Sequence, residues 1–292
     1  MSPDYIAAQI FNGLASGAFY ALLALGLSVI FGMLRIINFA HGAVYMLGAF
    51  ATYYAAQLLH VPFYPALILA PIAVGIFGML IEALILRRIS GSDPVYGLLL
   101  TFALTLVVVN LVRLLAGPLG SPYSVPPSLS SAVDLKFTIY PAYKLFVIAV
   151  SIVVCAVVWW FVERSLLGAR IRAATENPVL VRALGVDTKR LVTLAFGAGV
   201  ALAALAGVLA APTTNVQPYM GDDIIIYTFA IVVIGGLGSI TGSVVAGFAL
   251  GILQTIGAVY YPPIATTLIF IVMVIVIAIR PAGLFGRPES LR

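Results

Sequence analysis

Few polar side chains in this sequence could do chemistry, and the first of them are spaced three residues apart. Arg35, Asn38 and His41 follow a long apolar stretch. On a helix, residues with this spacing lie along one side, and polar groups in an apolar setting need partners. These residues could line a pathway, or they could satisfy backbone groups that are freed where a helix breaks.

The other reactive side chains exclude the common kinds of catalytic and metal centre. None of the three lysines follows a glycine, so the chain lacks the Gly-Lys-Ser/Thr ending of a phosphate-binding loop. The two histidines lack the spacing of a metal-binding pair, and no Gly-x-Ser-x-Gly sequence is present. The single cysteine, Cys155, lies in an apolar stretch and is interpreted as a small core residue. We therefore predict no catalytic residues, no metal site and no cofactor.

The composition indicates that most of this chain is surrounded by lipid. Hydrophobic residues make up 63% of the 292 residues and charged residues 9%, whereas soluble domains carry about 25% charged residues. The net charge of +5 comes from basic residues in short loops, which indicates membrane topology rather than nucleic-acid binding. No basic residue precedes Arg35, so the first apolar stretch is expected to be a retained helix and not a cleaved signal peptide.

Nine apolar stretches are visible, and a membrane crossing needs roughly 20 residues. They cover residues 6–31, 43–59, 64–86, 96–116, 142–162, 191–211, 224–235, 243–259 and 264–279. We predict an all-α, polytopic membrane helix bundle of about eight to nine transmembrane helices, forming a single domain over residues 1–292. Polar, glycine-containing sequences predict broken helices near Asn38–Gly42 and Gly235–Ser239, and the seventh stretch is expected to be a broken or partial crossing.

Basic residues predict the orientation, because Lys and Arg concentrate in cytoplasmic loops. Eleven of them fall into three regions: Arg87, Arg88, Arg164, Arg170, Arg172, Arg182, Lys189, Arg190, Arg280, Arg287 and Arg292. Two apolar stretches separate the first region from the second, and four separate the second from the third, so all three fit on one side. We predict an N-terminus outside, a cytoplasmic C-terminus and a cytoplasmic segment at about 163–190.

One acidic residue, Glu82, lies clearly inside an apolar stretch. A charge at membrane depth costs about 2.5–3.5 kcal/mol, and Arg87 and Arg88 follow about one and a half turns later. We interpret Glu82 as the partner of this basic end and not as an ion-coupling group.

The cytoplasmic segment contains a predicted short helix from Pro178 to Leu184. Asn177 is a favourable N-cap, proline suits the first helical position, and Gly185 suits the C-terminal end. Val181 and Leu184 are expected on one face. Because so short a helix is unstable alone in water, its apolar side must dock. It docks either on this chain's own membrane-facing ends or in a groove of a cytoplasmic partner, which could be an ATPase because the chain has no motor of its own.

Five sequences together resemble the permease subunits of the high-affinity branched-chain amino acid ABC importers, most closely the H-type subunit. They are INFAHG (37–42), LLLTFALTL (98–106), GARIRAATENPVLVRALGVD (168–187), VIGGLGSITGSVVAG (233–247) and RPAGLFGRPE (280–289). The resemblance covers almost the whole chain in the family's order. Glu176-Asn177-Pro178 departs from the more acidic, proline-free wording that is usual there.

The resemblance implies a non-enzymatic subunit in a bacterial inner (plasma) membrane. The implied partners are a homologous M-type permease, two cytoplasmic ABC ATPases and a periplasmic binding protein that delivers leucine, isoleucine or valine. The cytoplasmic helix would couple the permease to the ATPase. The residues assigned to this coupling are Glu176, Asn177, Pro178, Val181, Ala183, Leu184 and Gly185.

We predict ATP-driven import of branched-chain or similar hydrophobic amino acids by alternating access. Half-helix ends and unwound backbone can meet a carboxylate and an ammonium without a buried charged side chain. The candidate pathway residues are therefore Asn38, His41, Gly42, Gly235, Gly236, Gly238 and Ser239. The alternatives are a permease of the same family for urea, short amides or other amino acids, a stand-alone carrier or channel, and a membrane scaffold that transports nothing.

Overall fold

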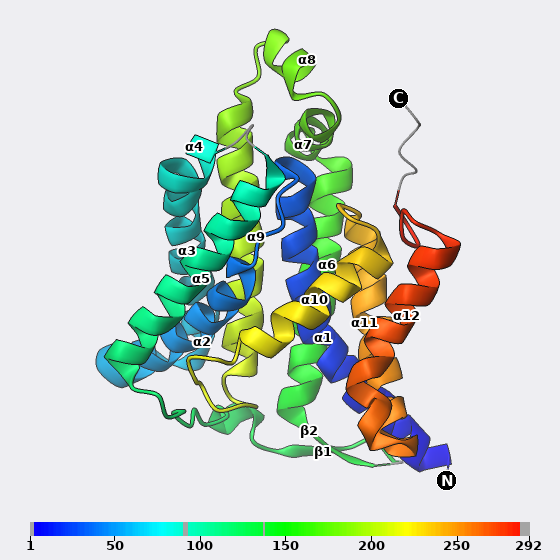
Figure 1. Cartoon of the computed structure of the whole chain (residues 1–292). Helices are drawn as coiled ribbons and strands as arrows, with labels where there is room; N and C mark the ends of the chain where they lie inside the picture. Colours follow the sequence, from blue (N-terminus) through cyan, green and yellow to red (C-terminus); the bar gives the residue numbers. More distant parts are fainter. Residues whose placement is uncertain (1–2, 90–92, 137, 287–292) are drawn as a thin grey trace. The chain divides into compact units, whose positions relative to one another are not determined.

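The structure, a computed structural model, describes residues 3–89, 93–136 and 138–286. It is built almost wholly of helices (Figure 1). The elements are α1 (Pro3–Leu34), α2 (Ala40–Leu59), α3 (Phe63–Ile81), the π-helix η1 (Glu82–Leu86), α4 (Arg87–Ile89), α5 (Pro94–Ala116), the 3₁₀ helix η2 (Pro127–Leu129), β1 (Ala132–Asp134), β2 (Ile139–Pro141), α6 (Ala142–Arg164), α7 (Leu166–Glu176), α8 (Pro178–Ala183), α9 (Thr188–Ala210), α10 (Asp222–Gly235), α11 (Ile240–Tyr260), the 3₁₀ helix η3 (Pro262–Ile264) and α12 (Ala265–Ile279). The two strands form one antiparallel pair.

All nine apolar stretches lie in helices, which confirms the predicted helical membrane bundle. Among the described residues, seven helical segments are long and apolar enough to cross a membrane, fewer than the eight to nine predicted. The two stretches outside this set are α2 and α10. The 14 residues of α10 extend about 21 Å at 1.5 Å per residue, short of a hydrocarbon core about 30 Å thick. α2 has 20 residues, but its histidine, glutamine and tyrosines lower its hydropathy.

The chain divides into two compact units that alternate along the sequence. One unit comprises residues 1–25, 124–155 and 226–292, and the other comprises residues 26–123 and 156–225. The helices α1, α6 and α10 each contribute residues to both units. Arg287 and Arg292, two of the basic residues expected on the cytoplasmic side, lie outside the described residues.

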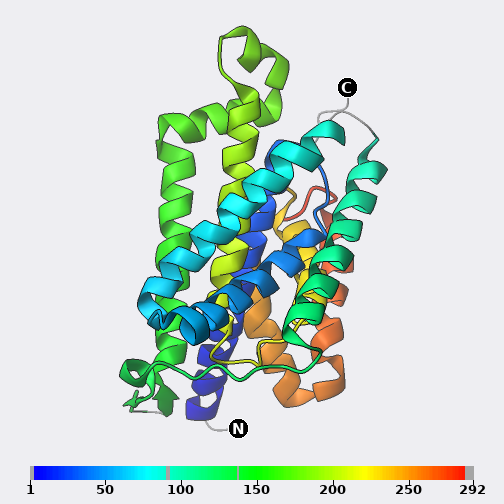
Figure 2. The same ribbon diagram turned by 90° about the vertical axis from the view of Figure 1, so that its left-hand side faces the viewer.

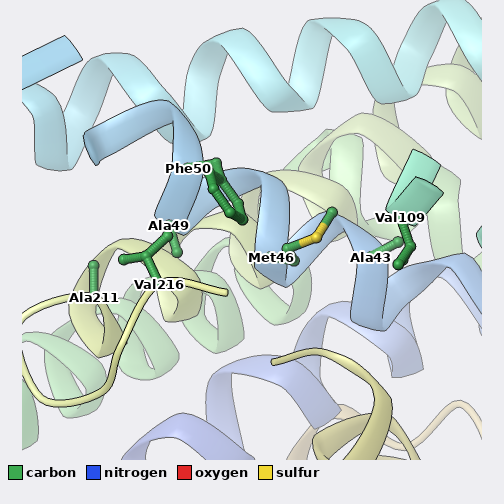
Figure 3. Packing of buried hydrophobic residues seen from close by; sticks show 7 residues of the cluster. All are labelled: Ala43, Met46, Ala49, Phe50, Val109, Ala211 and Val216. Carbon is green, nitrogen blue, oxygen red and sulfur yellow. The ribbon is translucent and has the colours of Figure 1, made fainter. Parts of the chain in front are cut away.

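In the second unit, α2 and α3 both pack along α9 through small residues. A Cβ added to Gly48 of α2 would lie 2.6 Å from the Cα of Ala204, and one added to Gly75 of α3 would lie 3.1 Å from Ala201. Small residues let membrane helices approach closely. Next to this contact is a core that α2, α5 and the chain after α9 build together (Figure 3). Its buried residues are Ala43, Met46, Ala49, Phe50, Val109, Ala211 and Val216.

The two ends of the second unit differ in character. The short helices α4, α7 and α8 lie at one end, and α8 stands beyond the start of α9 (Figures 1 and 2). At the other end, the loop after α5 pairs with the chain after α9, where Ser121 and Val216 exchange backbone hydrogen bonds of 2.9 and 3.0 Å. The basic residues of α4, α7 and α8 therefore share one end of this unit.

In the first unit, the N-terminal part of α1 packs against α11 through glycines. A Cβ at Gly13 would lie 2.5 Å from the Cα of Ile252, and one at Gly17 would lie 2.8 Å from the Cα of Phe248. The Tyr20 hydroxyl donates a 2.7 Å hydrogen bond to Gln254. This bond pairs two polar side chains across the contact between the two helices, as the absence of water in lipid requires.

Candidate functional site

The short helix α8 is held at both ends by the predicted capping residues. The Oδ1 atom of Asn177 accepts a 2.9 Å hydrogen bond from the Leu180 amide, and Pro178 occupies the first helical position. At the other end Gly185 has a φ of +82°, its amide donates to the Arg182 carbonyl, and the Val186 amide donates to the Val181 carbonyl. This pair of bonds is a Schellman motif. The predicted helix is confirmed, one residue shorter than expected.

The side chains of α8 point in two directions, and this differs from the expected single apolar face. Val181 is buried and packs against Ala174 of α7 and Leu191 of α9. Leu184 is 75% exposed, as are Val179 at 74% and Leu180 at 57%. Val181 and Leu184, which were expected on one face, differ in burial: Val181 is covered by α7 and α9, whereas Leu184, in the C-cap after the last helical residue Ala183, is exposed. The other residues assigned to coupling, Glu176, Asn177, Pro178, Ala183 and Gly185, are also exposed.

The first break in the membrane helices lies at residues 35–39, a few residues before its predicted position. α1 ends at Leu34, Arg35 has a φ of +52°, and α2 begins at Ala40. His41 and Gly42 are therefore helical. The helical spacing proposed for Arg35, Asn38 and His41 is wrong, because the residues from Arg35 to Asn38 are not in a helix.

A threonine from α5 holds this break in place. The Thr101 hydroxyl accepts a 3.2 Å hydrogen bond from the Phe39 amide and lies 3.1 Å from the Ile37 carbonyl, to which it can donate. Gly97, one turn earlier in α5, makes room for the chain, since a Cβ there would lie 2.5 Å from Ile36. One amide and one carbonyl of the break are thus bonded to a side chain rather than to water, as irregular backbone within a membrane requires.

Asn38 is the buried polar residue at the centre of the break. It is 2% exposed, and its Oδ1 atom accepts a 3.1 Å hydrogen bond from the Ala40 amide at the start of α2. Among the described residues, its Nδ2 atom has no hydrogen-bond acceptor. His41 is fully buried on the first turn of α2, and Gly42 packs directly on the backbone of Gly221, whose carbonyl oxygen would lie 2.5 Å from an added Cβ.

The second break is confirmed where it was predicted, and it is a tight turn packed by backbone. Gly236 and Gly238 have φ values of +106° and +79°, a conformation that favours glycine, and the Ser239 hydroxyl caps α11 by accepting from the Gly242 amide. The segment after α12 lies on this turn: the Phe285 amide donates a 3.0 Å hydrogen bond to the Gly235 carbonyl. These contacts give all four candidate residues a structural role.

The predicted pairing of Glu82 with the basic end is also confirmed. Its carboxylate is 1% exposed and forms a 2.9 Å ion pair with Arg87 across the π-helix η1. The Thr193 hydroxyl, on the first turns of α9, lies 2.6 Å from the same carboxylate. In the part of the chain that the structure describes, no group of three or more His, Cys, Asp or Glu side chains could hold a metal ion.

The model of one protein family matches almost the whole chain. It is described as "Branched-chain amino acid transport system / permease component" and covers residues 9–279. The chain belongs to this family. It is a multi-pass membrane permease component and not an enzyme.

Curated relatives match this permease along its full length. The chain is 31% identical to the high-affinity branched-chain amino acid transport system permease protein BraD of Pseudomonas aeruginosa, over 96% of each chain. It is 29% identical to the permease protein LivH of the corresponding system of Escherichia coli, over 98% of this chain and 97% of the relative. A more distant match, 25% identical over 94% of this chain and 87% of the relative, is the ribose import permease protein RbsC of Haemophilus influenzae.

The sequence did not predict a role for two threonines of this permease, although one bonds to the backbone of the first break and the other to the Glu82 carboxylate. Thr101 contacts the break at 35–39, and Thr193 contacts Glu82. Both lie in apolar helices. Thr101 is part of the LLLTFALTL sequence quoted for the family resemblance, but the feature that marks each threonine individually is a hydroxyl in an apolar setting. Helical threonines also bond to their own backbone, as Thr105 does to the Thr101 carbonyl, so this signal alone does not separate the two uses.

Proposed function

We propose that this chain is the membrane-spanning permease subunit of an ATP-driven importer for branched-chain or similar hydrophobic amino acids, and that α8 couples it to separate ATPase subunits. The names of BraD and LivH support the substrate class. The observation that carries the coupling role is the exposed apolar surface of α8, formed by Val179, Leu180 and Leu184. Three large apolar side chains on a helix stabilised by its own caps are suited to a groove on another protein.

The burial of one apolar side chain of α8 and the exposure of the others support this role. Val181 anchors the helix to α7 and α9, so a force applied to the exposed residues is transmitted to the membrane helices instead of bending the loop. A six-residue helix would not be stable alone, and the anchor together with the two caps supplies the missing stability. The expected alternatives, docking on the chain itself and docking on a partner, are therefore combined in one helix.

For the translocation pathway, we limit the proposal to the first break. Asn38 brings a buried amide donor with no acceptor among the described residues, and α2 begins two residues later with its partly positive N-terminal end. Both features suit the carboxylate of an amino acid. His41, which is buried on the first turn of α2, is the second residue of the proposed path. Gly42, Gly235, Gly236, Gly238 and Ser239 are excluded from the proposed path, because close backbone contacts, positive φ values or a capping bond account for them.

The proposed assembly contains a homologous permease, two cytoplasmic ABC ATPases and a periplasmic amino-acid-binding protein, in a bacterial inner membrane. Asn110 supports the second permease: it is exposed on α5 among large apolar residues, and its Nδ2 atom donates only to the Leu106 carbonyl one turn earlier. An exposed amide within a membrane helix is expected to face protein or a water-filled path and not lipid. We propose that the N-terminus is outside and that α4, α7, α8 and the C-terminus are cytoplasmic, following the basic residues.

The test is transport by the assembled complex in proteoliposomes. We expect ATP-dependent leucine uptake from the wild-type complex and no uptake by the permease alone. The double variant Leu180→Asp, Leu184→Asp should lose association with the ATPase and uptake together. Leu119→Asp is the matched control, because Leu119 is 82% exposed in the loop after α5, at the opposite end of the second unit.

Three outcomes would overturn parts of this proposal. Leucine flux through the permease alone would indicate a stand-alone carrier or channel. ATP-dependent uptake of urea, a short amide or ribose in preference to leucine would change the substrate. A double variant that still binds the ATPase and transports leucine like the wild type would remove α8 from the coupling contact. Val181→Asp is unsuitable for this test, because it places a charge in the packed anchor and unfolds the helix.

A further inference from the structure

The last turn of α1 is attached directly to the α7–α8 segment. The Nη2 atom of Arg35 donates a 3.1 Å hydrogen bond to the carbonyl oxygen of Thr175. Thr175 lies in the last turn of α7, where helix carbonyls lack partners within the helix, and Asn177, the N-cap of α8, follows two residues later. Met33, two residues before the break, packs on the residues that anchor α8, including Val181.

Arg35 is also the first residue after α1, in a conformation that costs energy. Its φ of +52° lies in the left-handed region, which a residue with a side chain adopts rarely and at a cost of order 1 kcal/mol or more. Such outliers persist where surrounding contacts hold them in place and are frequent at functional sites. The bond to Thr175 is one such contact, and the Thr101 bonds to Ile37 and Phe39 hold the chain on the other side of the break.

From these contacts we propose that Arg35 is the positioning residue through which movement of α8 reaches the break at residues 35–39. This inference rests on the proposed function of α8 and of the break. The connection is short: α8 is joined to α7 by the Val181 anchor, the end of α7 is joined to Arg35, and Asn38 follows three residues after Arg35. When the ATPase moves α8, Arg35 carries the movement into the segment that holds the Asn38 amide. Arg35 does not touch the substrate.

The side chain and the backbone of Arg35 can be tested separately. Arg35→Ala removes the bond to Thr175 and keeps the backbone strain. Arg35→Gly removes the bond and relieves the strain, because glycine adopts a positive φ freely. Arg35→Lys keeps a cationic donor and the strain. Arg88→Ala is the matched control, since Arg88 is an exposed arginine of α4 and its loss changes the charge equally.

The readout is the amount of leucine taken up per ATP hydrolysed by the complete complex with its binding protein. Loss of a hydrogen bond from a charged donor shifts an equilibrium by about tenfold, and by less at an exposed site. We therefore expect uptake per ATP to fall about threefold to tenfold in Arg35→Ala and Arg35→Gly alike. ATP hydrolysis and ATPase association should be retained, with partial recovery in Arg35→Lys and no change in Arg88→Ala.

Four results would overturn this inference. Unchanged uptake per ATP in Arg35→Ala would show that the bond to Thr175 transmits nothing. Recovery in Arg35→Gly but not in Arg35→Lys would place the effect in the backbone. Equal losses of uptake and ATP hydrolysis, or loss of the assembled complex, would assign Arg35 to the fold alone, as a cap of α7. Failure of the proposed function itself would look different, because the wild-type complex would then not couple uptake to ATP.

Discussion

The contact between α2 and α9 leaves no room for a single methyl group at Gly48. In Gly48→Ala, the new Cβ would lie 2.6 Å from the Cα of Ala204 and closer still to its carbonyl. The obstacle is backbone, so no flexible side chain can move aside, and the two helices must separate. Overpacking costs about 1–3 kcal/mol and sometimes more. If the two helices move apart by about 0.5–1 Å, each dispersion contact between α2 and α9 loses a quarter to a half of its energy. We therefore expect Gly48→Ala to lower the free energy of unfolding by about 3 kcal/mol.

The assay is thermal unfolding of the purified subunit in detergent, followed by intrinsic fluorescence. For a chain of 292 residues, a fall of about 3 kcal/mol in the free energy of unfolding corresponds to a fall in midpoint of about 5 °C. Gly32→Ala is the matched control, because its Cβ would meet its nearest neighbour, the Cγ2 atom of Thr175, at 3.8 Å. It should be neutral or stabilising by up to about 1 kcal/mol, since alanine is the better helix former. A midpoint for Gly48→Ala equal to that of Gly32→Ala would refute the packing argument.

Two further sets of substitutions probe the buried side chains of Glu82 and Thr101. Arg87→Ala leaves the buried Glu82 carboxylate without its counter-ion and should lower the free energy of unfolding by about 3 kcal/mol. Glu82→Gln leaves Arg87, which is 35% exposed, free to reach solvent and should cost about 1 kcal/mol; equal midpoints for the two variants would contradict this asymmetry. Thr101→Val removes the acceptor of the Phe39 amide and should cost about 1–3 kcal/mol, whereas Thr101→Ser keeps the hydroxyl. If Thr101→Ser lowered the unfolding midpoint as much as Thr101→Val does, the methyl group and not the hydrogen bonds would account for the stability.

The features that sequence reasoning predicted correctly are those determined by neighbouring residues. The caps of α8 follow from Asn177, Pro178 and Gly185, because each acts on backbone groups within four residues of itself. The Glu82–Arg87 pair follows from a spacing along one helix. The turn before α11 follows from Gly236 and Gly238, which adopt positive φ values that few other residues tolerate.

The features that the sequence did not reveal depend on distant segments. The first break falls at residues 35–39, where no glycine or proline marks it, because Thr101 of α5 supplies the hydrogen bonds that make it possible. Val181 is buried, and Leu184 is exposed, because α7 and α9 cover only one side of α8. The sequence of α8 alone does not predict which of its sides α7 and α9 cover. Helical periodicity also placed Arg35 and Asn38 in a helix that ends before them.

The separation of buried and exposed side chains on α8 bears on how permeases of this kind could come to work with a different ATPase. Val181 must fit the body of its own subunit, so it can change only together with the residues it packs against. Val179, Leu180 and Leu184 are largely exposed, so a change at these positions disturbs the packing of this subunit less. Under the proposed role, these three positions could be grafted from one transport system to another to redirect the choice of ATPase, while the membrane-embedded machinery stays untouched.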